Sequence, residues 1–209
     1  MGFSEPKESK AEEEQLVKSL QAGQMDSFER LANLYQKKIY TLSFNLTRNA
    51  MDSEDVTQEV LLTLFKKIHT FQGRSAFSSW VYRITLNATY MKLRSRKKEQ
   101  SISIDELLPS FNGSGFQQER TQDWSENTES LLFDNEVRET IQKAVNSLPD
   151  KEKVVFLLRD VEGLPTENVS EILELTIPAV KSRLHRARLF LRKKLASYFD
   201  EYKTRKEMK

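Results

Sequence analysis

The chain has 209 residues, of which 38% are hydrophobic, and a formal net charge of only +2, so it can bury one ordinary core or two small ones. It has no cysteine, and its two histidines, His69 and His185, are far apart in sequence, which argues against disulfides, metal sites and any cofactor. The polar, acidic N-terminus and the lack of an apolar run approaching about 20 residues exclude a signal peptide and a membrane span. We therefore expect a cytoplasmic protein.

Charge is unevenly distributed along the chain. Residues 66–98 carry nine Lys or Arg and no acid, residues 101–136 carry eight acids and one Arg, and residues 177–209 carry eleven basic and three acidic residues. Basic segments with interleaved aromatic residues favour nucleic-acid binding, because neutralising phosphates releases counterions. The same charges would also suit two solvated helix faces.

The hydrophobic pattern predicts an all-α protein, since apolar residues recur at helical spacing and no segment alternates long enough for a strand. Helices are predicted over about residues 11–22, 26–46, 52–72, 75–98, 134–147, 150–161, 166–173 and 177–199. Asp52, with Asp55 three positions on, resembles a capping box. Residues 99–133, rich in polar and acidic side chains, predict a flexible acidic linker between domains at 11–98 and 134–209, with a polar tail at 1–10.

The predicted helix over residues 52–72 has an unusual polar face. Its buried side is predicted to hold Val56, Val60, Leu61, Leu64, Phe65 and Ile68, which leaves Asp55, Gln58, Glu59, Leu62 and Lys66 exposed. Leu62 is then an apolar side chain within a polar surface. A single exposed Leu is ordinary, but acids and an amide around a Leu would suit docking onto a partner helix.

The next predicted helix carries an aromatic and basic face. Its core stripe is predicted to hold Phe77, Val81, Ile84, Ala88 and Met91, whereas Arg83, Asn87, Tyr90 and Arg94 share another face with Trp80 at its edge. Aromatic rings stack on bases, an amide can read a base edge, and Arg neutralises phosphate. The preceding loop adds Gly73 and Arg74, and a flipped base could bind there. Alternatively, Trp80 and Tyr82 simply cover the core.

Residues 165–195 predict a helix-turn-helix. Thr176 is a suitable N-cap and Pro178 fits the first turn of the second helix. The inward side of this helix is predicted to hold Val180, Leu184, Ala187, Leu191 and Leu195. The outward side, with Pro178, Ser182, His185 and Arg186 flanked by Lys181 and Arg183, is what a major-groove recognition helix presents. A solvated basic helix is the alternative interpretation.

Two segments resemble a known family in the right order. DSEDVTQEVLLTLFKKIHTFQGRSAFSSWVYRITLNATYMKLRSRKK, residues 52–98, resembles region two of an extracytoplasmic-function (ECF) sigma factor. LPDKEKVVFLLRDVEGLPTENVSEILELTIPAVKSRLHRAR, residues 148–188, resembles region four. The resemblance implies two small helical domains in a bacterial, nucleoid-associated subunit of RNA polymerase without catalytic activity.

The resemblance also implies partners. Region two would bind the clamp helices of the polymerase β′ subunit and melt the promoter −10 element. Region four would read the −35 element and contact the flap of the β subunit. The linker would thread toward the active-site and RNA-exit channels, and an anti-sigma protein would restrain the chain.

Each implied role is assigned to residues of this chain. The polymerase-binding residues would be Asp55, Gln58, Glu59 and Leu62. The −10 binding and melting residues would be Phe71, Gly73, Arg74, Ser75, Phe77, Trp80, Tyr82, Arg83, Asn87, Tyr90 and Arg94. The −35 residues would be Thr176, Pro178, Lys181, Ser182, Arg183, His185 and Arg186.

Two positions depart from the family pattern. Many relatives have Asp where this chain has Met91, and Gly in the helix-turn-helix turn where this chain has Glu174; the second difference implies a turn that does without a left-handed glycine. The main alternative function is a helix-turn-helix regulator with an N-terminal signal or dimerisation domain. A helical nuclease is disfavoured, because the basic segments contain no convincing metal-ligand cluster.

Overall fold

The computed structural model describes residues 7–24, 26–103 and 128–207, and over these ranges it contains helices and no strand. The elements are α1 (Lys7–Gln21), α2 (Asp26–Thr47), α3 (Ala50–Lys67), η1 (Ile68–Thr70), α4 (Phe77–Ser103), α5 (Thr128–Asn146), α6 (Asp150–Phe156), η2 (Leu157–Val161), α7 (Thr166–Leu173) and α8 (Ile177–Glu207). The all-α prediction is confirmed. Most of the predicted linker, 104–127, lies outside the described residues, as do residues 1–6 of the predicted tail.

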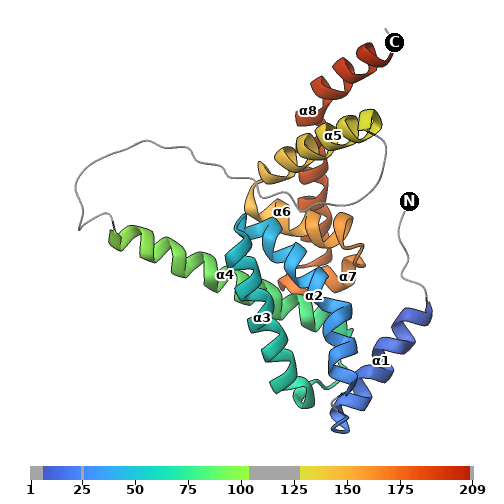
Figure 1. Cartoon of the computed structure of the whole chain (residues 1–209), viewed down its shortest axis with the longest axis vertical. Helices are drawn as coiled ribbons and strands as arrows, with labels where there is room; N and C mark the ends of the chain where they lie inside the picture. The colour runs from blue at the N-terminus through green and yellow to red at the C-terminus, as the bar shows by residue number, and fades with distance from the viewer. Residues whose placement is uncertain (1–6, 25, 104–127, 208–209) are drawn as a thin grey trace.

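The N-terminal module, α1–α4, is held together by the apolar faces of its helices. Its core includes Leu31, Tyr35 and Ile39 from α2, Val56, Val60 and Leu64 from α3, and Val81 from α4. The hydroxyl of Tyr35 donates a 2.6 Å hydrogen bond to Glu13 of α1, so this buried phenol is satisfied. In Figure 1, α4 crosses α3 at about mid-height, and its C-terminal half projects to the left, away from the other helices.

Three details of the predicted N-terminal helices are wrong. Asn49, not Asp52, caps α3, because its side-chain oxygen accepts a 2.9 Å hydrogen bond from the backbone N–H of Asp52. Met91 is 66% exposed rather than buried. Phe65 is 40% exposed at the rim of the module, where its ring packs edge-on against Phe28.

The C-terminal module, α5–α8, contains the predicted helix-turn-helix in α7 and α8. Thr176 Oγ1 accepts a 3.4 Å hydrogen bond from the backbone N–H of Ala179, as expected of an N-cap. Glu174 has φ 53° and ψ 44°, so the turn keeps the left-handed conformation without glycine. The predicted helix 150–161 is in fact divided into α6 and the π-helical turn η2.

The two modules pack against each other. One hydrophobic cluster contains the core of the C-terminal module together with three buried residues of the N-terminal module, Leu42, Tyr82 and Leu86. In Figure 1, α7 lies beside α4. Among the described helices, none is both long and apolar enough to cross a membrane.

Candidate nucleic-acid interface

The polar face predicted on α3 is exposed in the structure. Asp55, Gln58 and Glu59 lie on the surface, and Leu62 is 57% exposed in their midst. The carboxylate of Asp55 accepts a 2.7 Å hydrogen bond from Lys92 of α4, which orients this carboxylate toward α4. The structure therefore presents an apolar side chain within a polar, partly acidic surface, as the sequence predicted.

The loop before α4 is organised by aromatic packing. The ring of Trp80 lies 5.3 Å from that of Phe71 and 5.6 Å from that of Phe77, measured between centroids. The side chain of Gln21 from α1 donates a 2.7 Å hydrogen bond to the carbonyl of Phe71. Phe77 is thus part of the core of the N-terminal module, and Trp80 and Phe71 pack against this core.

Beyond Phe71, the loop is open to solvent. Gly73 has φ 68°, a left-handed conformation that favours glycine. Gly73 and Arg74 are exposed and Ser75 is half-buried. These residues line one side of a cavity whose other walls come from α1 and from residues 162–171 of the C-terminal module.

The predicted −10 face of α4 is divided by the module contact. Asn87 and Arg94 are exposed and Tyr90 is 39% exposed. Tyr82, however, is only 2% exposed, and its hydroxyl donates a 2.6 Å hydrogen bond to Glu162. Arg83 donates a 2.7 Å hydrogen bond to the backbone carbonyl of Glu171. The structure therefore brings Asn87, Tyr90 and Arg94 together in reach of solvent, and separates Tyr82 and Arg83 from them.

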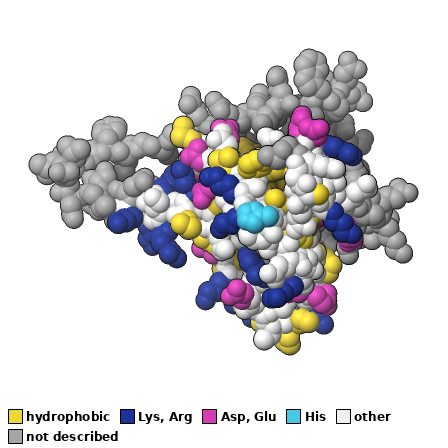
Figure 2. Space-filling model, turned by 90° about the horizontal axis from the view of Figure 1, so that it is seen from below, with side chains coloured by type: hydrophobic (Ala, Val, Ile, Leu, Met, Phe, Trp, Pro, Cys, Tyr) yellow, Lys and Arg dark blue, Asp and Glu magenta, His cyan; other side chains and the backbone are white. Residues whose placement is uncertain are grey.

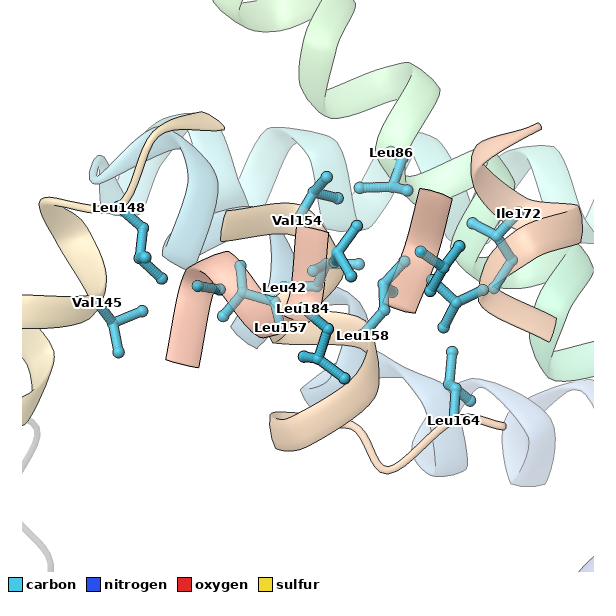
Figure 3. Packing of buried hydrophobic residues seen from close by; sticks show 14 of the residues in the cluster. Leu42, Leu86, Val145, Leu148, Val154, Leu157, Leu158, Leu164, Ile172 and Leu184 are labelled. Atoms are coloured by element: carbon cyan, nitrogen blue, oxygen red, sulfur yellow. The ribbon is translucent and has the colours of Figure 1, made fainter. Parts of the chain in front are cut away.

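The boundary between the modules, which we name the module seam, has an apolar centre. It joins Leu42, Tyr82 and Leu86 of the N-terminal module to residues such as Leu158 and Ile172 of the C-terminal module. Figure 3 shows Leu86, from α4, beside the cluster formed by the C-terminal helices. Nothing in the local sequence of α4 distinguishes Leu86 from a residue buried within its own module.

Charged groups lie at the edge of the module seam. Burial lowers the pKa of Arg48 to about 10. Burial also lowers the pKa of Lys153, an effect that Asp150 opposes and Arg48 reinforces. Burial, followed by the charge of Asp150, raises the pKa of Tyr90. Burial at this edge therefore disfavours the charged forms of two cations, one from each module.

The recognition face predicted on α8 lies on the surface. Exposed residues are Thr176, Pro178, Lys181, Ser182, His185 and Arg186, and Arg183 is half-buried. Arg186 is held from two sides: its Nε donates to Glu152 of α6 at 3.1 Å and its Nη1 donates to Ser182 at 2.9 Å. Sequence reasoning missed Glu152, because it lies 34 positions before Arg186 and gave no motif signal.

Basic and acidic side chains alternate on the surface. Figure 2 shows Lys and Arg side chains distributed over one face of the molecule with acidic side chains among them, rather than one uninterrupted basic patch. Arg188 illustrates the mixing, since it binds Asp160 through contacts of 2.6 and 2.8 Å, and this hydrogen bonding raises the pKa of the guanidinium. Within the described ranges, no group of His, Cys, Asp and Glu could hold a metal ion.

Comparison with known proteins assigns both modules. Residues 31–99 match the family described as Sigma-70 region 2, and residues 138–191 match Sigma-70, region 4. The first range covers most of α2–α4 and the second covers the helix-turn-helix. The N-terminal match disfavours a regulator with a signal or dimerisation domain in this position.

Similar proteins align over most of the chain. It is 31% identical to the ECF RNA polymerase sigma factor SigW of Bacillus subtilis over 86% of its length and 94% of the relative's. It is 28% identical to the RNA polymerase sigma-H factor of Pseudomonas aeruginosa over 91% and 97% of the two lengths. For the ECF RNA polymerase sigma-E factor of Escherichia coli K12, the identity is 30% over 83% and 88%.

Two solved structures share the fold. The sigma factor RpoE of Bartonella quintana, in complex with the anti-sigma factor NepR, matches with a TM-score of 0.63 and 22% identity, over 82% of this chain and 98% of that one. CnrH, in complex with the cytosolic domain of CnrY, matches with a TM-score of 0.63 and 18% identity over 89% and 98%. Two family matches in order, and relatives aligned over nearly their whole length, show that this chain belongs to the ECF family of RNA polymerase sigma factors.

Proposed function

We propose that the exposed surfaces on α3, α4 and α8 divide the work of a sigma factor among them. The chain is a transcription initiation factor that binds RNA polymerase and directs it to promoters. In the proposal, the α3 surface around Leu62 binds the β′ clamp helices of core polymerase. The loop at 71–77 and the α4 face contact the −10 element, and the outward half of α8 reads the −35 element. The protein has no catalytic role of its own and acts in the cytoplasm, on the nucleoid.

The main observation behind this assignment is that one apolar side chain is exposed within the polar surface of α3. Leu62 is 57% exposed although its neighbours Val60 and Leu64 are almost fully buried. A solvent-exposed Leu ringed by Asp55, Gln58 and Glu59 is what a helix-on-helix contact uses, with an apolar centre and a polar rim. Asp55, Gln58, Glu59 and Leu62 are exposed in the structure with the modules packed together, so this surface is available in that arrangement.

The α4 and α8 surfaces suit different forms of DNA. On α4, Tyr90 offers a ring for stacking and Asn87 an amide, as single-stranded bases require. On α8, the N-terminal half is exposed and basic, and Arg186 is pre-positioned by Glu152 and Ser182, as base-edge reading in a duplex groove requires. The flap of the β subunit is a further proposed partner of the C-terminal module.

An anti-sigma protein is a further proposed partner. One similar structure is a complex with the anti-sigma factor NepR. The cavity between α1, the 71–77 loop and α7 is lined by both modules, so a polypeptide bound there would contact both at once.

The test combines retention and transcription. The purified chain is incubated with core RNA polymerase, complexes are isolated by pull-down, and run-off transcription is measured on genomic promoter fragments. We expect retention on core polymerase and transcripts that require the chain. Retention without promoter-specific transcripts, or DNA binding without retention, would contradict the proposed function.

A further inference from the structure

An apolar side chain lies within the exposed stripe of α4. Asn87 is followed three and four positions later by Tyr90 and Met91, and Arg94 lies one turn farther on. These four side chains therefore share one side of the helix, which we name the α4 stripe. Met91 is 66% exposed, more than Tyr90 at 39%, and Asn87 and Arg94 are exposed as well. Because side chains four positions apart are neighbours on a helix, a base bound by Asn87 lies within reach of Met91.

The opposite side of α4 is held by carboxylates of α3. Lys92 donates a 2.7 Å hydrogen bond to Asp55. Arg96 contacts Asp52 at 3.2 Å. With 3.6 residues per turn, Lys92 and Arg96 lie on the side of the helix away from Asn87. Positive charge on that side is therefore matched within the protein, whereas the α4 stripe faces solvent.

Packing does not account for an apolar residue at position 91. Met91 belongs to neither of the two hydrophobic clusters formed by the described residues, and its side chain is 66% exposed. Many relatives carry Asp here, so an apolar side chain is not a requirement of the fold. The identity of this residue is then free to serve recognition.

Met91 differs from a carboxylate and from an amide in what it offers a base. A carboxylate accepts a hydrogen bond from the amino group of cytosine, and an amide such as that of Asn87 pairs with an adenine edge. A thioether donates nothing and is a weak acceptor, but it adapts well to apolar surfaces. Thymine carries an apolar group on its edge, the 5-methyl group. A cytosine placed against Met91 would leave its amino group without an acceptor, which is unfavourable.

We propose that Met91 is a specificity-determining residue of the −10 contact, which selects thymine over cytosine at one position of the separated strand through the 5-methyl group. The inference rests on the proposed function, which assigns α4 to that strand, and it names the base that one residue of the α4 stripe recognises. Substitution of Asp for Met91 should reverse the preference at this position and leave the preferences at the other positions unchanged.

Selection from a randomised −10 strand tests the proposal. Core polymerase is combined with the full-length parent chain, Met91→Ala or Met91→Asp. Each complex is then incubated with pre-melted promoters that share the −35 element and spacing of a promoter found by run-off transcription. In these promoters the non-template −10 bases are randomised, and the bound fraction is sequenced. Pre-melting removes the energy of base pairing from the comparison.

We expect the parent to prefer thymine to cytosine at least about fivefold at one position. Met91→Ala should reduce this preference below about twofold, and Met91→Asp should favour cytosine about fivefold. Met51→Ala removes the same side chain from a position on α3 that is 73% exposed, and it should keep the parent preference. Thermal unfolding of each variant should match the parent, because both methionines are exposed.

Deoxyuridine isolates the methyl group, since it differs from thymidine at the base edge only by lacking that group. At the selected position, thymine to uracil should weaken binding of the parent complex about three- to fourfold, as expected for one buried methyl. The same replacement should change the affinity of the Met91→Ala complex less than about 1.5-fold. An equal loss in the parent and in Met91→Ala would overturn the assignment of the methyl contact to Met91.

The outcomes separate this inference from the proposed function. If the parent selects −10 bases but no position responds to Met91→Ala or Met91→Asp, the role of Met91 is overturned and the assignment of α4 to the −10 strand stands. If a scrambled −10 strand is bound as tightly as the selected one, that assignment fails, and the role of Met91 fails with it.

Discussion

The two DNA-facing helices of this sigma factor differ in how much of their predicted surface is free. On α8, six of the seven residues assigned to the −35 element are exposed and Arg183 is half-buried. On α4, Asn87 and Arg94 are exposed, whereas Tyr82 is 2% exposed and bound to the other module. A helical pattern therefore predicts which face of a helix is not buried in its own module. It does not predict which part of that face a second module covers.

The difference has a physical origin in the apolar residues around α4. Leu42 and Leu86 add a second apolar patch to the N-terminal module, apart from the core around Tyr35 and Val60. A patch of this kind is unfavourable in water, and the C-terminal module covers it. On α8, by contrast, the apolar stripe of Val180, Leu184, Ala187 and Leu191 is buried in the core of its own module.

The largest effect is expected for a change on the α3 surface. This surface lies outside the comparison of α4 with α8, because the C-terminal module does not cover it. Leu62→Arg should weaken binding to core polymerase at least about 100-fold, since an apolar centre of a protein interface dominates its energy. Thermal unfolding should change little, because the side chain is exposed. Met91→Arg, a similar change at a residue that is 66% exposed on α4, should leave polymerase binding intact. Unchanged polymerase affinity of Leu62→Arg in a pull-down titration would remove α3 as the docking surface.

The predicted −10 face of α4 is tested at an exposed residue by Asn87→Ala and at a half-buried residue by Trp80→Ala. Each should cost about 1–3 kcal/mol in open-complex formation, measured by permanganate footprinting, and a pre-melted promoter should restore part of the loss. Trp80→Ala should also lower the melting temperature, because Trp80 packs on Phe71 and Phe77. Asn87→Ala should not, since it is exposed. Normal promoter opening by both variants would show that this face has only a structural role.

The open face of α8 is tested through Arg186 and the carboxylate that holds it. Arg186→Ala should cost about 1–3 kcal/mol on the preferred −35 element and relax discrimination at one base pair. Glu152→Gln should have a smaller effect of the same kind, because it frees the Arg186 guanidinium without removing it. Lys193→Ala, farther along α8, should affect only the salt dependence. Binding of the full-length chain to a library of −35 duplexes at two salt concentrations separates these outcomes. No change in affinity for Arg186→Ala at either salt concentration would mean that a different face of α8 contacts DNA.

The smallest expected effect concerns the turn that orients α8. Glu174 adopts φ 53°, which costs a non-glycine residue roughly 1–2 kcal/mol. Glu174→Gly should therefore raise the free energy of unfolding by up to about 1 kcal/mol, after the entropy cost of glycine is included. Glu167→Gly, within α7, should lower the same free energy by about 1 kcal/mol. Urea denaturation of both variants checks the opposite signs, and a loss of stability in Glu174→Gly would show that the Glu side chain contributes more than its backbone costs.

Much of this architecture could be predicted from the sequence because it depends on local spacing. The all-α class, the exposed Leu62 and the Thr176 cap each follow from residues within a few positions of one another. The hydrogen bonds that Tyr82 and Arg83 donate to the C-terminal module could not be predicted, since Glu162 and the Glu171 carbonyl are 80 and 88 positions away. A long-range contact of that kind leaves no periodic signal.

Other differences arose where the sequence pattern was correct for a helix as a whole but did not determine the role of a single residue. Asp52 and Asp55 form an acidic first turn that resembles a capping box, yet Asn49 supplies the hydrogen bond. Met91 continues the apolar spacing of α4, yet its side chain is 66% exposed. Glu152 could have been suggested only by asking which carboxylate might orient Arg186.

The most direct test of this account is the distance between the modules before and after promoter opening. Gln24 and Lys151 are exposed, one on each module, and cysteines placed there can carry a donor and an acceptor dye. We predict efficient energy transfer in the free chain, and a clear loss of transfer when core polymerase and promoter DNA are added and permanganate shows the −10 bases open. Unchanged energy transfer in a complex with open promoter would show that the modules stay closed while α4 works, and it would contradict the account.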